Sequence, residues 1–147
     1  MKDNLNPFHL AIPVSNLEKS VIYYRDILGL KEGRSSNKWA DFDSFGHQLV
    51  CHVSDSINEQ ITNPVDGEEV PVPHFGVVLS IEEFEEFLLK INDKEIDFII
   101  EPTIRFKGEV GEQRTMFFKD PSGNAIEIKA FKAVSYTHLT LPTILLV

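Results

Sequence analysis

Pro7-Phe8-His9-Leu10-Ala11-Ile12-Pro13-Val14-Ser15-Asn16-Leu17-Glu18 is one half of a pattern that the sequence contains twice. The second copy is Pro73-His74-Phe75-Gly76-Val77-Val78-Leu79-Ser80-Ile81-Glu82-Glu83. In each copy a serine stands six residues after the histidine, and a glutamate follows three residues later. Ser-x-x-Glu is typical of a capping box, which satisfies free backbone amides at a helix start. Each copy therefore predicts a strand that carries a histidine and leads directly into a helix.

The residues after these strands repeat the same order of elements. Helical spacing predicts helices over 15–28 and 81–91. Short antiparallel strands are expected from 33 to 53, including 39–42 and 48–52, and in the second half at 97–101, 113–118 and 124–131. Each half then reads β-α-β-β-β, and neither half could bury its sheet and its helix well alone. We predict an α+β fold in which two βαβββ modules form a cup-shaped mixed sheet with the helices outside.

The boundaries of the modules follow from composition. We assign 1–53 to the first module, 54–71 to a polar linker with turn signals at Asn63-Pro64 and Asp66-Gly67, and 72–132 to the second module. The segment 133–147 has no counterpart in the repeat. It resembles translated adapter or vector sequence, so we interpret it as a non-native tail and set aside its His138. The alternative is a native tail that packs on a sheet edge or a dimer.

Composition narrows the possible partners and compartment. A net charge of -9 argues against nucleic acid and against an anionic membrane surface, which would both repel the chain. A single cysteine, Cys51, excludes an internal disulfide and fits a reducing compartment. No signal-like stretch precedes the first strand, and no segment is long enough to span a bilayer, so we expect the cytoplasm.

Strand alternation brings three possible metal ligands onto sheet faces. His9 shares a face with Ala11, and His74 shares a face with Gly76, so small neighbours leave space beside both imidazoles. Glu127 lies in an otherwise apolar strand, where a buried carboxylate needs a cation. Two histidines and one carboxylate suit a divalent metal, notably iron(II). In the alternative interpretation both histidines are ordinary strand residues and the glutamate is exposed at an edge.

The two halves differ at the position of the carboxylate. Glu127 lies four residues after the turn glycine Gly123, whereas Val50 lies four residues after Gly46. Gln48 and His52 flank Val50 on the same face and could support the site or transfer protons, and ordinary strand polarity explains them equally well. Further candidates for the rim of the cavity, each equally compatible with a surface salt bridge, are Arg34, Trp39, Arg105, Glu112 and Arg114.

The sequence resembles the vicinal-oxygen-chelate superfamily, which includes glyoxalase I, extradiol dioxygenases, fosfomycin-resistance enzymes and bleomycin-resistance proteins. The resemblance covers residues 7–131, and within the superfamily the sequence resembles a bacterial branch of predicted extradiol-type dioxygenases. It is carried by Phe8-His9-Leu10-Ala11-Ile12-Pro13-Val14, Phe45-Gly46-His47-Gln48-Leu49-Val50, Val72-Pro73-His74-Phe75-Gly76-Val77-Val78 and Asp120-Pro121-Ser122-Gly123-Asn124-Ala125-Ile126-Glu127. The resemblance implies paired modules around a divalent metal held by His9, His74 and Glu127.

We therefore expect a metal-dependent oxidoreductase, an extradiol-type dioxygenase that cleaves a small catechol-like substrate. His9, His74 and Glu127 would hold the metal, with iron(II) favoured and manganese, nickel, cobalt or zinc possible, and His52 would be the catalytic residue that transfers protons. The alternatives are a glyoxalase-like lyase or isomerase, a thiol transferase, and a non-catalytic small-molecule binder. Family analogy predicts a homodimer. The modules could close one cup within a chain, or His9 and His74 of different chains could share a metal.

Overall fold

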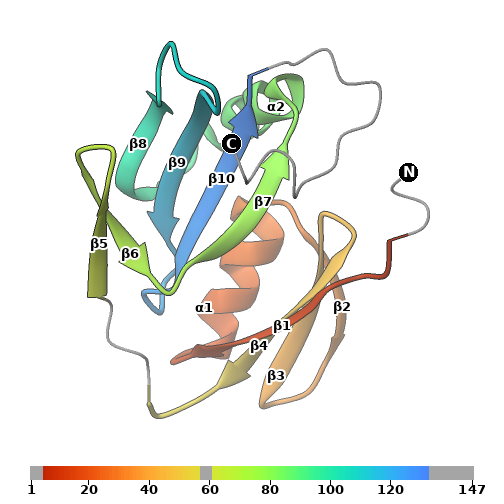
Figure 1. Ribbon diagram of the computed structural model, residues 1–147. Helices are drawn as coiled ribbons and strands as arrows, with labels where there is room; N and C mark the ends of the chain where they lie inside the picture. Colours follow the sequence, from red (N-terminus) through yellow and green to blue (C-terminus); the bar gives the residue numbers. More distant parts are fainter. Residues whose placement is uncertain (1–4, 57–60, 133–147) are drawn as a thin grey trace.

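The computed structural model describes residues 5–56 and 61–132, which form two βαβββ modules (Figure 1). The predicted tail lies outside the described residues. The first module contains β1 (His9–Val14), α1 (Leu17–Val21) with its π-helical continuation η2 (Ile22–Ile27), β2 (Lys31–Ser35), β3 (Trp39–Ser44) and β4 (His47–Val53). The hairpin of β5 (Ile61–Val65) and β6 (Glu68–Val72) follows. The second module contains β7 (Phe75–Leu79), α2 (Ile81–Ile91), β8 (Asp97–Arg105), β9 (Gln113–Lys119) and β10 (Ala125–Phe131).

The two modules have the same strand order. One four-stranded sheet runs β1-β4-β3-β2, and the other runs β7-β10-β9-β8. In each, the first strand of the module pairs in parallel with the last, and the remaining pairs are antiparallel. The register places His9 opposite Gln48 in the first sheet and Gly76 opposite Glu127 in the second. The predicted α+β fold of repeated βαβββ modules is confirmed.

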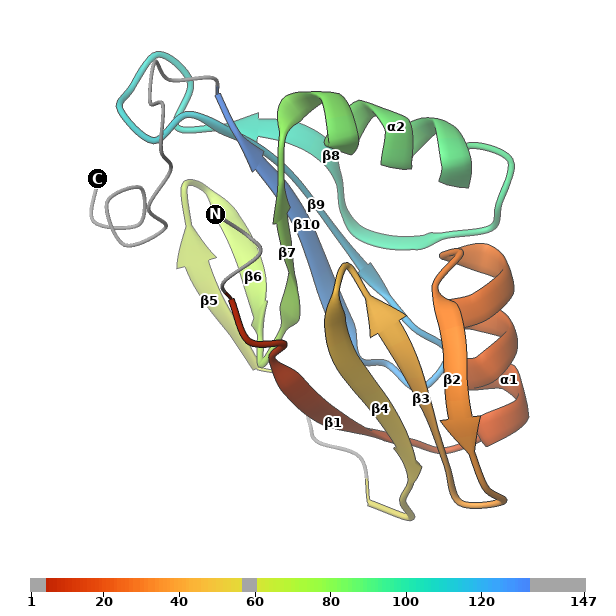
Figure 2. The same cartoon turned by 90° about the vertical axis from the view of Figure 1, so that its right-hand side faces the viewer.

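Alternation along the strands separates a core face from a functional face. Ile12 and Val14 of β1 are buried, and so are Ile126 and Ile128 of β10. These side chains and the apolar faces of both helices form one continuous core that spans the modules. Figure 2 shows α1 and α2 on one side of the molecule. Within the described ranges, no helix is long and apolar enough to cross a membrane.

The two helices begin with different caps. At α2 the predicted capping box is present, because Ser80 Oγ accepts from the Glu83 amide and Glu83 Oε1 accepts from the Ser80 amide, both at 3.0 Å. At α1 the predicted cap is wrong by one residue. Asn16 Oδ1 accepts from the Lys19 amide at 2.9 Å, and asparagine caps a helix as well as serine does. Ser15 instead points away and lies beside a turn of the second module.

The segment 54–71, interpreted above as a linker, contains most of a β-hairpin. Asp66 and Gly67 both have positive φ, 46° and 79°, which suits the two-residue turn that matches strand twist. Val70 of β6 packs on Ile100 and Phe117 of the second sheet. The hairpin and α2 therefore cover opposite faces of that sheet, as Figure 2 shows.

Candidate metal centre

His74 and Glu127 come together on the second sheet. His74 immediately precedes β7, and Glu127 lies in the middle of β10, the parallel neighbour of β7. His74 Nε2 lies 3.2 Å from Glu127 Oε2. The Glu127 side chain is only 8% exposed, whereas the His74 side chain is 29% exposed. The two donors therefore line a half-open cavity of about 250 Å³, to which Gly76, Val78 and Lys129 also contribute.

Gly76 allows the two strands to approach closely. A Cβ built on Gly76 would lie 1.5 Å from the backbone oxygen of Glu127, far inside the contact limit of real atoms. The small residue two positions after the histidine thus serves the packing of β7 against β10, and it also leaves space beside the imidazole. This explains in structural terms why a glycine stands at this point of the repeat.

The surroundings of Glu127 favour its charged form. Thr115 on β9 donates a 2.7 Å hydrogen bond to Glu127 Oε1, and Lys129 Nζ lies 3.4 Å from Glu127 Oε2. Burial by itself raises the pKa of this carboxyl group. The hydrogen bond from His74, the charge of Lys129 and the Thr115 hydroxyl outweigh burial, so the pKa of Glu127 is lowered. The residue is a buried anion that is ready to bind a cation.

His74 is held so that Nε2 faces the carboxylate. Its Nδ1–H donates to the Pro71 carbonyl oxygen at 2.7 Å, and its ring meets the edge of Phe117 with the centroids 5.0 Å apart. The hydrogen bond with Glu127 raises the pKa of His74 against the opposing effect of burial. A metal ion would replace the proton shared by this pair. One nitrogen and one oxygen donor with fixed outer partners therefore fit a divalent metal.

His9 lies on the other sheet. It is the first residue of β1, is exposed, and has its Nδ1 2.8 Å from Gln48 Oε1. Within residues 5–56 and 61–132, no three His, Cys, Asp or Glu side chains are close enough together to hold a metal. Within one chain, two of the three predicted ligands, His74 and Glu127, thus lie in contact. The third, His9, lies on the other sheet.

His52, the predicted acid or base, lies near the far end of β4. It is opposite Trp39 of β3 and four residues along the strand from Gln48. At about 3.3 Å per residue this is roughly 13 Å from the partner of His9. The structure places His52 on the same face as Gln48, without direct contact to the His74–Glu127 pair, and its catalytic role stays a prediction.

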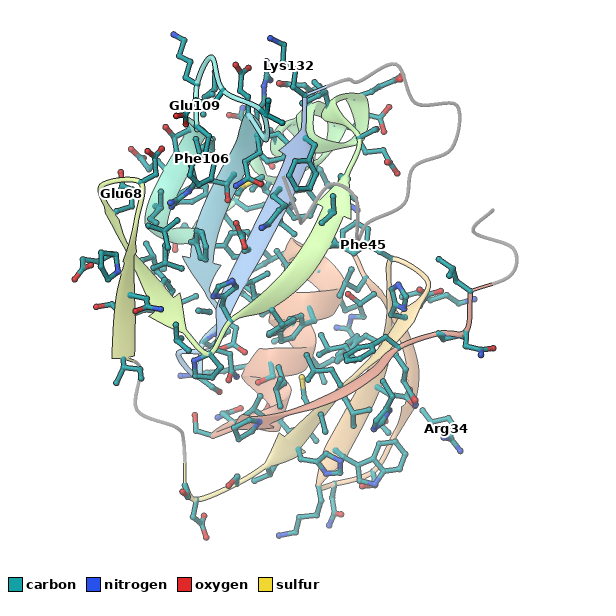
Figure 3. All side chains as sticks on the ribbon, in the orientation of Figure 1. Arg34, Phe45, Glu68, Phe106, Glu109 and Lys132 are labelled. Atoms are coloured by element: carbon teal, nitrogen blue, oxygen red, sulfur yellow. The ribbon has the colours of Figure 1, made fainter. Side chains whose placement is uncertain are left out.

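The predicted rim residues take several positions. Arg34 points outward from the first module (Figure 3) and lies over the Trp39 ring, 5.9 Å from its centroid. Arg114 forms an ion pair with Glu85. Glu112 Oε1 lies 3.8 Å from Lys132 Nζ and accepts a hydrogen bond from the Gly108 amide. The first of these is a cation–π contact, and the others are surface salt bridges and a local hydrogen bond.

Arg105 differs from the other rim candidates because it is buried. Its Nη1 donates to the Val65 carbonyl oxygen of the hairpin at 2.8 Å, and its guanidinium lies over Phe117. Among the residues that the structure describes, Nε and Nη2 have no hydrogen-bond partner. The residue therefore anchors the hairpin to β8.

The sequence analysis missed Thr115, Lys129 and Asp41 as parts of the site. Alternation along the last strand could have found Lys129, because it stands two residues after Glu127 and therefore shares its face. Thr115 and Asp41 carried no such signal, because their contacts depend on which strands become neighbours. Asp41 is buried and accepts a 3.2 Å hydrogen bond from Gln48 Nε2.

Comparisons with known proteins identify the family. Residues 7–128 match the model of the Glyoxalase/Bleomycin resistance protein/Dioxygenase superfamily. The chain belongs to this superfamily. A crystal structure of a glyoxalase/bleomycin resistance protein/dioxygenase from Alicyclobacillus acidocaldarius is 31% identical, with a TM-score of 0.77 over 90% of this chain and 96% of that one.

Two further matches are a curated relative and a solved structure. The metallothiol transferase FosB from Staphylococcus saprophyticus subsp. saprophyticus is 29% identical over 120 residues, 82% of this chain and 73% of FosB. A mutant of the fosfomycin resistance protein FosX from Listeria monocytogenes, with Mn(II) and 1S,2S-dihydroxypropylphosphonic acid, is 22% identical. Its TM-score is 0.61 over 84% of this chain and 87% of that one, which shows a shared fold.

The similarity to FosB corrects the predicted reaction class. FosB is a transferase, so the prediction of a ring-cleaving dioxygenase, an oxidoreductase, is wrong. Two histidines and a glutamate occur with many divalent metals, and the residue types alone could not select oxygen chemistry. Membership of the superfamily, predicted from the resemblance, is confirmed. The specific match to an extradiol branch is not supported.

Proposed function

We propose that this protein is a metal-dependent enzyme that joins a low-molecular-weight thiol to a small, oxygen-bearing electrophile. The observation that carries the proposal is the 3.2 Å approach of His74 Nε2 to Glu127 Oε2, with the opposite side of each group held by Pro71 or Thr115. The similarity to the metallothiol transferase FosB supports this reaction over the alternatives. A divalent metal fits the donors. The FosX structure contains manganese, whereas the residue types favour iron(II).

The third ligand would come from a second subunit. His9 lies on the first sheet, and the His74–Glu127 pair lies on the second, with one core joining the modules. We therefore place the complete centre in a homodimer, where His9 of the partner subunit approaches His74 and Glu127. Two equivalent centres would follow from the two-fold symmetry of such a dimer.

The thiol must come from a co-substrate. Cys51 is the only cysteine, and its thiol is buried on the core face of β4. Burial raises the pKa of Cys51 to about 12, with a smaller contribution from Asp120. The protein therefore has no reactive thiolate of its own near neutral pH.

The side chains around the His74–Glu127 pair indicate how the reaction would proceed. A bound metal would polarise the oxygen of the electrophile. The thiolate sulfur forms a bond to carbon, the carbon–oxygen bond breaks, and the oxygen keeps the electron pair and takes up a proton. Lys129 lies beside the pair and would stabilise negative charge that develops on this oxygen. His52 is retained as a candidate proton donor.

The reaction can be tested with the full chain after loading with manganese, iron, cobalt, nickel or zinc. Cysteine and glutathione would each be incubated with a panel of small epoxides that includes fosfomycin, and adducts would be detected by mass spectrometry. We expect an adduct in at least one combination and none with Glu127→Gln. A filled metal site that gives no adduct with any pair would discard thiol transfer. Ligand binding that survives His9→Ala and His74→Ala would identify a non-catalytic binder instead.

Mixing variants tests whether the centre is shared. His9→Ala and Glu127→Ala chains would each lack a complete site, but a mixed dimer would contain one intact site. Random pairing of equal amounts gives about half mixed dimers, and thus about a quarter of the wild-type sites. Recovery of roughly a quarter of the metal binding would support a shared centre. No recovery after co-refolding would place the centre within one chain.

A further inference from the structure

On the first sheet a hydrogen-bonded chain runs inward from His9. His9 Nδ1 lies 2.8 Å from Gln48 Oε1, and Gln48 Nε2 lies 3.2 Å from Asp41 Oδ2. Asp41 Oδ1 in turn accepts a hydrogen bond from the Arg34 amide at 2.5 Å. His9 is exposed, whereas Asp41 is only 7% exposed. The chain thus begins at a surface imidazole and ends at a buried carboxylate.

We infer that Asp41, acting through Gln48, is a positioning residue that fixes the tautomer and orientation of His9. A carboxylate only accepts hydrogen bonds, so the NH₂ group of Gln48 must face Asp41. The carbonyl oxygen of Gln48 then faces His9, and only a protonated Nδ1 can donate to it. The neutral imidazole therefore keeps its lone pair on Nε2. The inference rests on the proposed role of His9 as a metal ligand.

The same logic operates independently at His74. There Nδ1–H donates to the Pro71 carbonyl oxygen, and Nε2 faces Glu127. In both histidines Nδ1 is hydrogen-bonded, so Nε2 is the nitrogen left to bind a metal. The acceptor is a backbone oxygen at His74 and a side-chain amide oxygen at His9. An amide can rotate and exchange its oxygen for its nitrogen, whereas a backbone carbonyl cannot. A second group that holds the amide, which Asp41 provides, is therefore needed only on the first sheet.

A glycine makes room for the carboxylate. Gly33 lies in β2 where the register with β3 shifts. A Cβ on Gly33 would lie 2.3 Å from Asp41 Oδ1. Gly33→Ala would therefore push the carboxylate away without altering any group of the hydrogen-bonded chain. This gives a steric variant to compare with the chemical variants Asp41→Asn and Gln48→Leu.

The tautomer of His9 can be measured directly in the metal-free protein. Histidine labelled with ¹⁵N reports whether Nδ1 or Nε2 carries the proton at a pH where the imidazole is neutral. We expect Nδ1–H in the wild type, loss of that preference in Gln48→Leu, and a mixture of tautomers in Asp41→Asn and Gly33→Ala. His74 is an internal control, because its Nδ1–H signal should be unchanged in all three variants. Asp43→Asn removes the same charge two residues along β3 and should leave His9 unchanged.

Metal binding gives the second readout. Titration with Mn²⁺ should show an affinity roughly 10-fold to 100-fold lower in Gln48→Leu and Asp41→Asn than in the wild type, as loss of an outer-sphere partner typically does. His9 in the Nε2–H form in the wild type, or an unchanged tautomer in Gln48→Leu, would overturn the inference. An altered tautomer with unchanged Mn²⁺ affinity would also overturn it. If the wild type shows Nδ1–H but binds no metal, the proposed function fails while the hydrogen-bonded chain stands.

Discussion

The Tyr24 hydroxyl donates a 2.7 Å hydrogen bond to Asp120 Oδ2, and both residues are buried. Tyr24 belongs to the helix of the first module, and Asp120 begins the last turn of the second module. The same carboxylate accepts the Ser122 and Asn124 amides, and Asn124 Nδ2 donates to the Pro13 carbonyl oxygen. This turn therefore fastens the two modules to each other as well as connecting β9 to β10.

Tyr24→Phe should lower the free energy of unfolding by about 1–2 kcal/mol, because a charged acceptor loses a buried donor. Chemical denaturation would measure the change. Tyr23→Phe is the matched comparison, since the Tyr23 hydroxyl donates at 3.1 Å to the neutral Lys119 carbonyl oxygen. The decrease in the free energy of unfolding should be smaller for Tyr23→Phe than for Tyr24→Phe. Equal losses for the two variants would contradict a special role for the Tyr24–Asp120 bond.

Gly76→Ala should destabilise the second sheet by about 1–3 kcal/mol or more, because the added methyl group collides with the Glu127 backbone. Gly46→Ala provides the control. Gly46 has a φ of 86° and no atom near its built Cβ, so that variant carries only a conformational cost of about 1–2 kcal/mol. Thermal unfolding should rank Gly76→Ala as the less stable protein, and its metal affinity should fall as well. The reverse ranking would mean that β7 moves aside without penalty.

Glu127→Gln should weaken divalent metal binding by at least about 10-fold, because an amide oxygen replaces the buried carboxylate beside His74. Calorimetric titration with Mn²⁺ would show this. Glu86→Gln, an exposed position on α2, changes the net charge equally and should leave the affinity unchanged. A parallel loss in both variants would attribute the effect to overall charge.

The stability of the metal-free protein should depend on the pH through the His74–Glu127 pair. The pKa of Glu127 is lowered, so its contribution is present above the usual value of 4.5 and is lost as the pH falls through the folded-state pKa. The pKa of His74 is raised, so its contribution is complete below 6.5 and is lost as the pH rises through the folded-state pKa. The stabilisation by the pair is therefore greatest between about 4.5 and 6.5.

Chelator-treated wild type and His74→Gln should consequently differ most at pH 6, by a few tenths to about 1 kcal/mol because His74 is partly exposed. The difference should shrink at pH 8.5. Urea denaturation at the two pH values would measure it. A difference that is constant with pH would show that the pair is not an ion pair in the folded protein.

Cys51 should not react with Ellman's reagent in the native protein between pH 7 and 9, because its thiol is buried and its pKa is raised to about 12. Full reaction should follow only after unfolding in guanidinium chloride. Cys51→Ala should retain any thiol transfer activity. Rapid labelling of the folded chain, or loss of transfer in that variant, would require a protein thiol in the reaction.

The sequence predicted the modules because their signals are local. Apolar alternation, the helix over 81–91 and the turn glycines all arise within a few residues of one another. The first helix cap could not be placed, because Ser15 and Asn16 are both good caps and a residue of the other module decides between them. Ser122 Oγ accepts the Ser15 amide at 2.9 Å and lies 3.4 Å from Ser15 Oγ, so the Ser15 hydroxyl faces the other module and Asn16 Oδ1 caps the helix.

The candidate site was predictable in part for the same reason. His74 immediately precedes β7 and Glu127 lies on its parallel neighbour β10, so the order of strands within one module brings them close. The position of His9 depends on how the two modules pack, and no periodicity in the sequence contains that information. The hairpin was hidden because its exposed, polar strands resemble a linker, and only Asp66-Gly67 indicated its turn.

The hairpin also shortens the tether between the modules. With β5 and β6 folded onto the second sheet, only residues 54–60 join β4 to that unit. Seven residues reach at most about 25 Å when fully stretched, whereas the eighteen residues of an open linker would reach on the order of 60 Å. The short tether therefore restricts how far the first sheet of one chain can move relative to the second sheet of the same chain. The proposed homodimer would instead close the cup between two intact subunits.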